Sequence, residues 1–300
     1  MPRKGGPIQR RSLPYVKKVL AVASGKGGVG KSTVAVNLAF SLAMHSEHAP
    51  RTRPRVGILD LDIFGPSIPK LMALEKAEEP ELTAAGAIVP VVNHGLPCMS
   101  MGFLLPKIPG TDSSADTAVV WRGLMVQKAV QQLLFDVDWR DPGSGAELDV
   151  LVIDMPPGTG DVPLTLGQLV NVDGAVIVST PQDVALTDVR KGVSMFQKIS
   201  VPIVGLLLNE SHFICSSCST PHELFGSPAS FRATAEQFGV GVLGELPLVP
   251  GVSYGGDRGI PYALYSPDNA SGATDPGSKE WKETMAGVAS KVWQFLSLSK

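Results

Sequence analysis

SGKGGVGKST, residues 24–33, is the glycine-rich stretch that decides the fold. It follows the apolar run 19–23 and precedes hydrophobic residues at helical spacing, so it lies between a predicted strand and a predicted helix. Residues 25–32 match the phosphate-loop template, in which a glycine and four further residues precede Gly-Lys-Ser. Backbone N–H groups of such a loop surround phosphate oxygens at the positive end of the following helix. The match in this context favours a nucleotide-binding loop over a plain flexible turn.

The loop carries two lysines with different expected roles. Lys31 is predicted to reach the β- and γ-phosphates of ATP, and the Ser32 hydroxyl to ligate Mg²⁺. Lys26 is surplus to the template and resembles the signature lysine of the SIMIBI class, which crosses a dimer interface to the partner's nucleotide. We therefore predict a homodimer in which both lysines are catalytic; the alternative is that Lys26 is a solvated loop cation. The residues expected to contact the nucleotide are Gly25, Lys26, Gly27, Gly28, Val29, Gly30, Lys31, Ser32 and Thr33.

Further apolar runs predict the rest of a sheet. They span residues 56–59, 150–153, 175–178 and 203–208, and none alternates polar with apolar positions. Continuous apolar strands separated by helical stretches indicate a parallel sheet that is covered on both faces. The predicted fold class is α/β, a doubly wound, mostly parallel sheet flanked by helices, of the deviant-Walker P-loop NTPase type. We expect a single ATPase domain over residues 18–300.

Acidic residues follow two of these predicted strands. Asp60 and Asp62 come directly after one strand, and Asp154 ends the next. Because ligands bind at the carboxyl edge of a parallel sheet, these carboxylates are expected in the ligand crevice. We predict that Asp60 is catalytic, that Asp62 binds Mg²⁺ and that Asp154 is the Walker B carboxylate. The backbone N–H of Gly158, in a Pro-Pro-Gly turn, is expected to contact the γ-phosphate. The alternative is that the three Asp residues are helix caps or turn formers.

Composition limits the classes of function. The 300-residue chain is 44% hydrophobic and 18% charged, and its net charge of -2 predicts no electrostatic footprint for nucleic acid. No apolar run approaches the roughly 18 residues that span a bilayer, so no transmembrane segment is expected. Three cysteines are too few for a disulfide framework, and their number is odd, which indicates a reducing compartment.

The two ends of the chain differ in character from its centre. Residues 1–17 are basic, and they are predicted to be either the remnant of a mitochondrial targeting segment or a plain basic tail. The predicted location is the mitochondrial matrix, with the cytoplasm as the alternative. Towards the C-terminus, apolar residues from Trp281 to Phe295 recur at helical spacing. Core packing of this amphipathic helix is favoured over peripheral membrane contact, because its polar face mixes acidic and basic side chains.

Cys215 and Cys218 form a CxxC pair after the strand predicted at residues 203–208. Two thiolates do not complete a tetrahedral site, so we expect a symmetric dimer to bring two such pairs together. Four thiolates suit Zn²⁺ and a [4Fe-4S] cluster equally. The same spacing also fits a redox-active pair or two buried structural cysteines. The five histidines have no ligand spacing among themselves. His212 and His222 flank the cysteine pair and are expected to be solvated loop residues; the alternative is that either modulates the pair.

These motifs together resemble the Mrp-type phosphate-loop ATPases that carry iron-sulfur clusters. The similarity covers nearly the whole chain, through SGKGGVGKST, LDLDIFGPS, VVWRG, LVIDMPPGTGDV, STPQDVALTDVRKG, the cysteine pair and PLVPGVSYGGDRGIP. It is greatest for the mitochondrial branch that assembles respiratory complex I, because the chain lacks the four-cysteine cluster that precedes the loop in cytosolic scaffolds. The resemblance implies ATP as the nucleotide, a bridging [4Fe-4S] cluster at Cys215 and Cys218, and an adenine contact for Asn209.

The predicted function is an ATP-dependent carrier that holds a labile [4Fe-4S] cluster across a homodimer. It is expected to deliver the cluster to apoproteins such as complex I subunits, with slow ATP hydrolysis that switches the dimer between arrangements. One alternative is a positioning or regulatory ATPase of the MinD/ParA type. Another is a zinc-stabilised dimeric ATPase without cluster chemistry.

Overall fold

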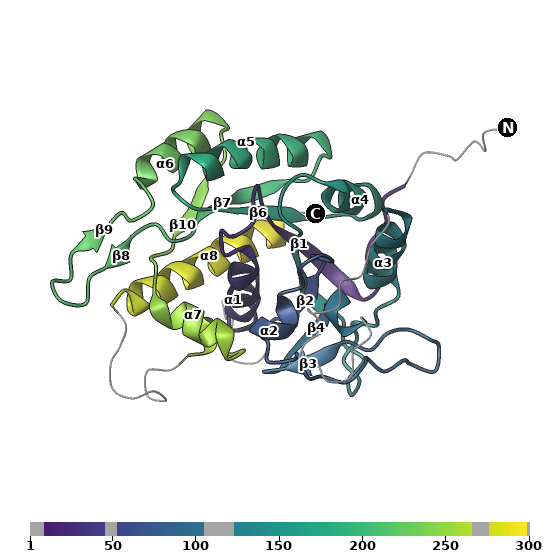
Figure 1. The fold of residues 1–300 in the computed structure, drawn as a ribbon. Helices are drawn as coiled ribbons and strands as arrows, with labels where there is room; N and C mark the ends of the chain where they lie inside the picture. Colours follow the sequence, from purple (N-terminus) through teal and green to yellow (C-terminus); the bar gives the residue numbers. More distant parts are fainter. Residues whose placement is uncertain (1–8, 46–52, 105–122, 266–275, 299–300) are drawn as a thin grey trace.

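The central feature is an 8-stranded sheet with the strand order β10-β7-β6-β1-β5-β2-β4-β3 (Figure 1). The computed structural model describes residues 9–45, 53–104, 123–265 and 276–298. Neighbouring strands are parallel except that the edge strand β3 runs antiparallel to β4. The strands are β1 Val16–Ser24, β2 Val56–Asp60, β3 Val91–Asn93, β4 Leu96–Ser100, β5 Leu148–Asp154, β6 Gly174–Ser179, β7 Ile203–Leu208 and β10 Val242–Glu245.

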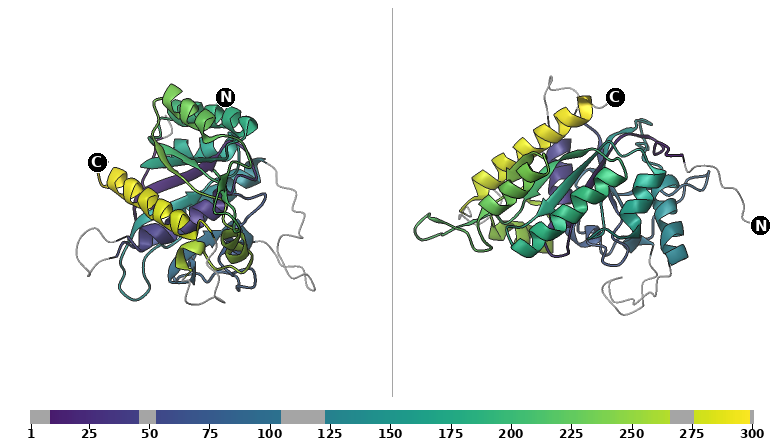
Figure 2. Two further views of the ribbon diagram at one scale, coloured as in Figure 1. Left: turned by 90° about the vertical axis from the view of Figure 1, so that its left-hand side faces the viewer. Right: turned by 90° about the horizontal axis from the view of Figure 1, so that it is seen from above.

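Helices cover both faces of this sheet. Helices α1, α2, α7 and α8 lie on one face and α3, α4, α5 and α6 on the other (Figures 1 and 2). The predicted doubly wound α/β fold is therefore confirmed. The helices are α1 Lys31–Ala43, α2 Ile68–Leu71, α3 Gly123–Phe135, α4 Asp161–Leu169, α5 Asp183–Lys198, α6 Pro228–Gln237, α7 Pro250–Asp257 and α8 Ser278–Leu298, with short 3-10 turns at Met101–Phe103 and Tyr262–Leu264.

The central strands are apolar along their whole length because both of their faces are covered. Every residue of β2 and β6 is buried, which explains the lack of alternation in their sequences. Helix α1 is buried on most of its circumference, since it packs between the sheet and α8. The sheet and these helices form one continuous hydrophobic core.

The direction of chain winding reverses beside β1, and this reversal defines the ligand crevice. Strand β1 pairs with β5 on one side and with β6 on the other, with Val22 opposite Asp154 and Ser24 opposite Val178. The strand that follows α1 is β2, which joins the sheet beyond β5. In doubly wound sheets ligands bind at such a switch point, outside the carboxyl ends of the strands.

Both ends of the described chain are packed on this body. Leu13 is buried, Arg11 forms a bridge with Val170, and β1 begins at Val16. The folded body thus includes residues that the sequence analysis assigned to the basic tail. Helix α8 buries an apolar stripe against α1 and β10, as expected for core packing, through Trp281, Met285, Val288, Ala289, Val292 and Leu296. Among the residues that the structure describes, no helix combines the length and hydropathy needed to cross a bilayer.

A separate hairpin projects from the body at the carboxyl side of β7. It consists of the short antiparallel strands β8 Phe213–Ile214 and β9 Pro221–His222 (Figure 1). At its base, the Leu248 N–H donates to the His212 carbonyl and the Ser211 N–H to the Leu246 carbonyl. These hydrogen bonds fasten the hairpin to the segment that follows β10.

Candidate functional site

The predicted phosphate loop connects the end of β1 to the start of α1 at the carboxyl edge of the sheet. Gly28 and Gly30 have φ angles of 78° and 77°, in the left-handed region that favours glycine. A Cβ on Gly30 would lie 2.3 Å from Asn209 Nδ2, so an alanine there would displace the Asn209 amide in addition to straining the backbone. A cavity of about 440 Å³ opens beside the loop and is lined by Lys26, Gly27, Gly28, Gly30, Lys31, Ser32, Thr33 and Asp62. Gly25 lies against Asp188 of α5, and Val29 is buried.

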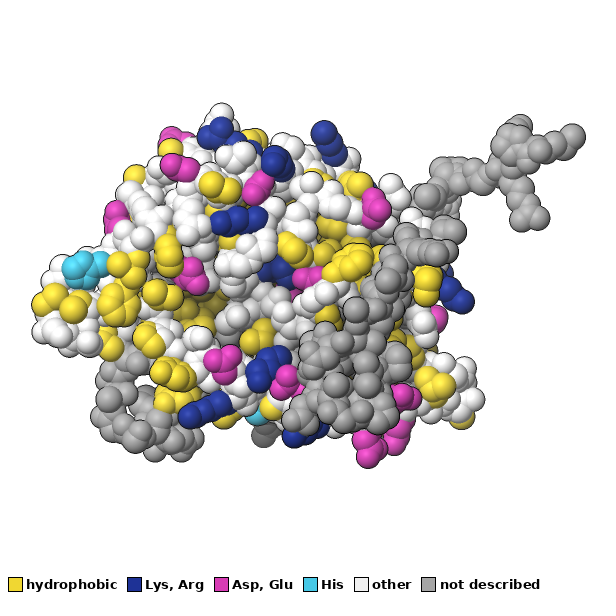
Figure 3. Space-filling model, in the orientation of Figure 1, with side chains coloured by type: hydrophobic (Ala, Val, Ile, Leu, Met, Phe, Trp, Pro, Cys, Tyr) yellow, Lys and Arg dark blue, Asp and Glu magenta, His cyan; other side chains and the backbone are white. Residues whose placement is uncertain are grey.

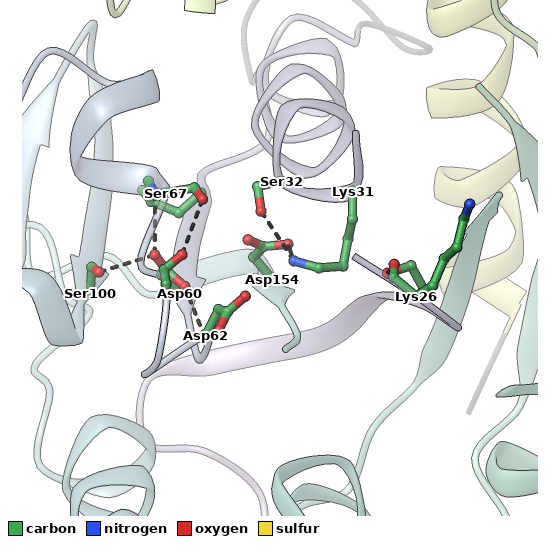
Figure 4. A network of polar contacts seen from close by, with 11 residues as sticks. Lys26, Lys31, Ser32, Asp60, Asp62, Ser67, Ser100 and Asp154 are labelled. Carbon is green, nitrogen blue, oxygen red and sulfur yellow. Dashed lines mark hydrogen bonds and ion pairs between the residues drawn. The ribbon is translucent and has the colours of Figure 1, made fainter. Parts of the chain in front are cut away.

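Lys31 and Asp154 form a buried ion pair under this cavity. Lys31 Nζ lies 2.5 Å from Asp154 Oδ1 and 3.1 Å from Ser32 Oγ (Figure 4). Burial raises the pKa of Asp154, and the Lys31 charge opposes the increase. The lysine predicted to bind phosphate and the carboxylate predicted to be Walker B are therefore in direct contact, with the predicted magnesium ligand Ser32 beside them.

Asp60 and Asp62 lie in different environments. The Asp60 carboxylate is completely buried and accepts hydrogen bonds from the N–H groups of Asp62 and Ile68 and from the Ser100 hydroxyl (Figure 4). Burial and then the Asp154 charge raise the pKa of Asp60 to about 8. Asp62 is half-buried and lines the cavity. In this structure Asp60 anchors the turn after β2, and Asp62 is the carboxylate that faces the loop. The catalytic role of Asp60 stays a prediction.

The Pro-Pro-Gly turn lies directly against the phosphate loop. The Gly158 N–H donates to the Ser24 carbonyl at 2.9 Å, and Pro157 lines the cavity. Gly158 has a φ of 86°. Its N–H was predicted to contact a γ-phosphate, whereas in this structure it is engaged by the loop backbone. A phosphate contact for Gly158 therefore requires that this hydrogen bond break.

Lys26 points away from the Lys31–Asp154 pair (Figure 4). Its Nζ lies 2.8 Å from Gln182 Oε1, at the start of α5, and its charge lowers the pKa of Glu210, which burial raises more strongly. Lys26 is half-buried. The lysine predicted to reach a partner is thus held by its own chain, and sequence reasoning did not single out Gln182 or Glu210 as its neighbours.

Asn209 lies beside the loop, just after β7. Its Nδ2 donates to the Val29 carbonyl at 3.0 Å. The residue expected to contact adenine therefore contacts the phosphate-loop backbone, and it connects the loop to the segment that leads into the hairpin.

The cysteine pair lies at the tip of the β8–β9 hairpin. Cys215 is half-buried and Cys218 is exposed, and both thiols are free. His222 completes a group of three, because its ring nitrogen and the two thiol sulfurs lie within 4.8 Å of one another. Hydrogen bonds from Thr220, and then from Cys215 and His222, lower the pKa of Cys218 to about 6. His222 is exposed, as expected, but a metal-ligating role was not predicted for it. The signal for that role in the sequence is the spacing of Cys215, Cys218 and His222, C-x2-C-x3-H.

The cavity fits Mg²⁺ and a nucleoside triphosphate. Asp154 Oδ2 is buried and has no hydrogen-bond partner among the described residues, so it can accept a hydrogen bond from a metal-bound water. Ser32 and Asp62 add two oxygen ligands of the kind that Mg²⁺ prefers. A larger cavity of about 510 Å³ lies near the starts of β2 and β4, around Val56 and Leu96, at the opposite edge of the sheet. The polar groups converge on the smaller cavity, which is therefore the candidate nucleotide site.

Comparisons with known proteins show the family of the chain. The family model described as ParA, NUBPL iron-transfer P-loop NTPase, matches residues 15–277. The chain is 43% identical over 294 residues to the mouse iron-sulfur cluster transfer protein NUBPL, covering 98% of this chain and 82% of the relative. It is 44% identical over 263 residues to the Arabidopsis thaliana iron-sulfur protein required for NADH dehydrogenase, mitochondrial, covering 88% of this chain and 77% of the relative. Among solved structures, the chain is similar to the nucleotide-binding protein from Archaeoglobus fulgidus in complex with ADP, in which cobalt was found. The TM-score is 0.65 and the identity 33%, and the match covers 82% of this chain and 87% of that one.

Proposed function

Because the chain belongs to the NUBPL iron-transfer P-loop NTPase family, we propose that it is an ATP-dependent carrier that holds a [4Fe-4S] cluster across a homodimer and delivers it to apoproteins. The observation that carries the proposal is the thiol pair, half-buried Cys215 and exposed Cys218, on a projecting hairpin of a P-loop NTPase. The cluster is cargo, so its ligands must be accessible to an acceptor. Cys218 at the tip of the hairpin meets that requirement.

Four thiolates complete the ligand set of a [4Fe-4S] cluster, and one chain supplies two at this hairpin. A two-fold dimer brings the same surface of each subunit together, so two hairpins can share one cluster. Large hydrophobic side chains are exposed on segments at the carboxyl edge of the sheet, namely Phe64, Val184, Leu224 and Tyr254. Figure 3 shows hydrophobic side chains gathered over the hairpin end of this face. Such a surface supports contact with a second copy of the chain.

The residues around the cavity divide the work of phosphoryl transfer. Lys31 neutralises the β- and γ-phosphates after it leaves Asp154, and Ser32, Asp154 and Asp62 surround Mg²⁺. Asp60 holds the turn that positions Asp62. Lys26 exchanges its contact with Gln182 for the nucleotide of the second subunit. Hydrolysis then removes the γ-phosphate that both subunits contact, and the dimer arrangement changes with it.

The acceptors and location follow from the relatives. The name of the Arabidopsis thaliana relative connects it with mitochondrial NADH dehydrogenase. We propose that this chain likewise serves complex I subunits in the mitochondrial matrix. Residues 1–8, part of the basic stretch on which the targeting prediction rests, lie outside the described residues.

The test is anaerobic reconstitution of the full chain with iron and sulfide, followed by transfer to an apo [4Fe-4S] acceptor with and without ATP. The variants are Cys215→Ala with Cys218→Ala, and Cys98→Ala as the matched control, because Cys98 is buried in β4. We expect a brown dimer with about four irons per two chains for the wild type and the control, and none for the double variant. A colourless wild type that still dimerises with ATP would overturn the carrier and favour a zinc-bound ATPase.

A further inference from the structure

The hairpin tip assembles three metal-ligating side chains within a single chain. Cys215, Cys218 and His222 bring their ligand atoms within 4.8 Å of one another. The β8–β9 ladder sets this proximity by pairing Phe213 with His222 and Ile214 with Pro221. A cluster shared by two chains uses only the thiols, so the imidazole is a ligand that the proposed cluster site does not need.

Main-chain hydrogen bonds fix the backbone positions of the two cysteines in the turn. The Cys215 N–H donates to the Thr220 carbonyl at 3.1 Å, and the Ser219 N–H donates to the Cys215 carbonyl at 2.9 Å. Ser219 has a φ of 54°, in the left-handed region, which closes the chain sharply after Cys218. The two cysteines are therefore arranged by main-chain hydrogen bonds.

The spacing is close to that of a bound tetrahedral ion. With metal–sulfur bonds of about 2.3 Å, two sulfurs on a tetrahedral ion lie about 3.8 Å apart. The ligand atoms lie within 4.8 Å of one another, so an inward movement of about 1 Å completes the geometry. Cys218 and His222 are exposed, so rotation of their side chains delivers this movement without displacing the core.

We infer that one chain binds one divalent transition-metal ion of the zinc class through Cys215, Cys218 and His222. Two thiolates and a neutral imidazole form a soft donor set that suits Zn²⁺, Co²⁺ or Fe²⁺, whereas Mg²⁺ and Ca²⁺ require oxygen ligands. Two thiolates also balance the charge of a divalent ion. The fourth coordination position is open to water or to a second chain. This site shares its thiols with the proposed cluster site, but it does not depend on the dimer.

His212 shows by contrast why His222 is the ligand. Both histidines flank the cysteine pair, but His212 Nδ1 lies 3.1 Å from Ser211 Oγ and its Nε2 lies 3.4 Å from Glu280. His212 is thus engaged at the base of the hairpin, while His222 is adjacent to the thiols at the tip. The two residues make a matched pair for mutagenesis.

Single-chain binding has a chemical consequence for cluster loading. An ion held by both thiols of one chain leaves no thiolate for a cluster that bridges two chains. The ion and the cluster therefore compete for Cys215 and Cys218, and His222 contributes only to binding of the ion.

The test uses Co²⁺ as the probe, titrated anaerobically into the reduced full-length chain. Visible d–d bands report tetrahedral cobalt, and near-ultraviolet charge-transfer absorption reports thiolate ligands. Competition with Zn²⁺ gives the affinity, and size-exclusion chromatography gives the oligomeric state. The variants are His222→Ala, the control His212→Ala, and Cys215→Ala with Cys218→Ala, each checked for its fold by circular dichroism.

We expect one Co²⁺ per monomer for the wild type and His212→Ala, and no thiolate charge transfer in the double cysteine variant. Loss of a residue that merely supports a metal ligand costs about 10–100-fold in affinity, so we expect at least about 10-fold weaker binding for His222→Ala. Equal affinity in wild type and His222→Ala, absence of binding, or one ion per two chains in a dimer would each overturn the inference. Cluster reconstitution of His222→Ala is measured in a separate experiment, which tests the carrier proposal. Failure of the carrier proposal is therefore distinguishable from failure of this inference.

Discussion

The Lys31 ammonium contacts the Asp154 carboxylate at 2.5 Å, and both side chains are buried. The positive charge of Lys31, the residue predicted to bind phosphate, is therefore neutralised by a carboxylate of the same chain. In the proposed function, an incoming triphosphate competes with Asp154 for Lys31, and the displaced carboxylate becomes available to water on Mg²⁺. On that proposal, this one buried contact couples phosphate binding to metal binding.

Replacement of Lys31 by Ala should destabilise the protein itself as well as abolish ATP binding. Removal of one partner from a buried ion pair leaves an uncompensated charge, which costs about 3–5 kcal/mol in the free energy of unfolding. Urea denaturation without nucleotide measures this cost. The control is Lys17→Ala, which breaks the more exposed 2.8 Å pair with Asp149 and should cost at most about 1 kcal/mol. Equal stability of the two variants would contradict the buried-pair interpretation.

Gly30→Ala should be more damaging than Gly28→Ala. Both glycines have a left-handed φ, so each substitution costs about 1–2 kcal/mol of backbone strain. A Cβ on Gly28 would meet no atom of the described part of the chain within 4 Å, whereas one on Gly30 would lie 2.3 Å from Asn209 Nδ2. Overpacking adds about 1–3 kcal/mol to the cost at Gly30. Thermal unfolding of the two variants without nucleotide measures the difference, and equal losses would exclude a steric role for Asn209.

Lys26→Ala should retain nucleotide binding and lose ATP-dependent dimerisation. The expected reason is that Lys26 contributes its charge to the partner's nucleotide after it leaves Gln182. Sedimentation velocity with a non-hydrolysable ATP analogue measures the dimer. Gln182→Ala is the matched variant, because it frees Lys26 without removing the charge, and it should dimerise at least as well as the wild type. If the Lys26→Ala dimer is as stable as the wild-type dimer, Lys26 is a solvated loop cation and does not contribute to dimerisation.

Asp60 should make the protein less stable as the pH rises. Its folded-state pKa is raised from 3.8 to about 8, first by burial and then by the Asp154 charge. Between these values the folded chain binds more protons at this group than the unfolded chain, so the free energy of unfolding falls with pH, by at most about 1.4 kcal/mol per pH unit. The contribution is fully present below pH 3.8 and is lost as the pH rises through about 8.

Urea denaturation of Asp60→Asn from pH 5 to pH 8 tests this prediction. The variant cannot titrate at this position, so its stability should depend less on pH than that of the wild type. Asp257→Asn, at an exposed position at the end of α7, is the control and should retain the wild-type slope. An unchanged slope in Asp60→Asn would show that another group titrates.

The sequence predicted the central strands well because a doubly covered sheet leaves a local signature. Residues 203–208 are continuously apolar, and β7 has these same bounds, Ile203–Leu208. No tertiary information is needed to recognise such a strand. The same applies to the helix after the phosphate loop, which begins at Lys31.

The roles of Asp60 and Asp62 could not be separated from the sequence alone. Asp60 lies opposite Ser100 in the pairing of β2 with β4, and this neighbour belongs to a strand 40 residues away. The proximity of His222 to the thiols likewise depends on the β8–β9 register. The sequence supplies the ligand types, whereas the pairing of distant segments determines which side chains meet.

The attachment of the hairpin to the phosphate loop has a consequence for the dimer. Asn209 holds the Val29 carbonyl, and Cys215 follows six residues later, a contour length of about 20 Å. Ser211 and His212 fasten the middle of this segment to the body. The position of each thiol pair is thus fixed relative to the phosphate loop of its own chain. In a symmetric dimer the distance between the two thiol pairs then depends on the distance between the two phosphate loops. Nucleotides bound between the loops therefore determine the width of the cluster site.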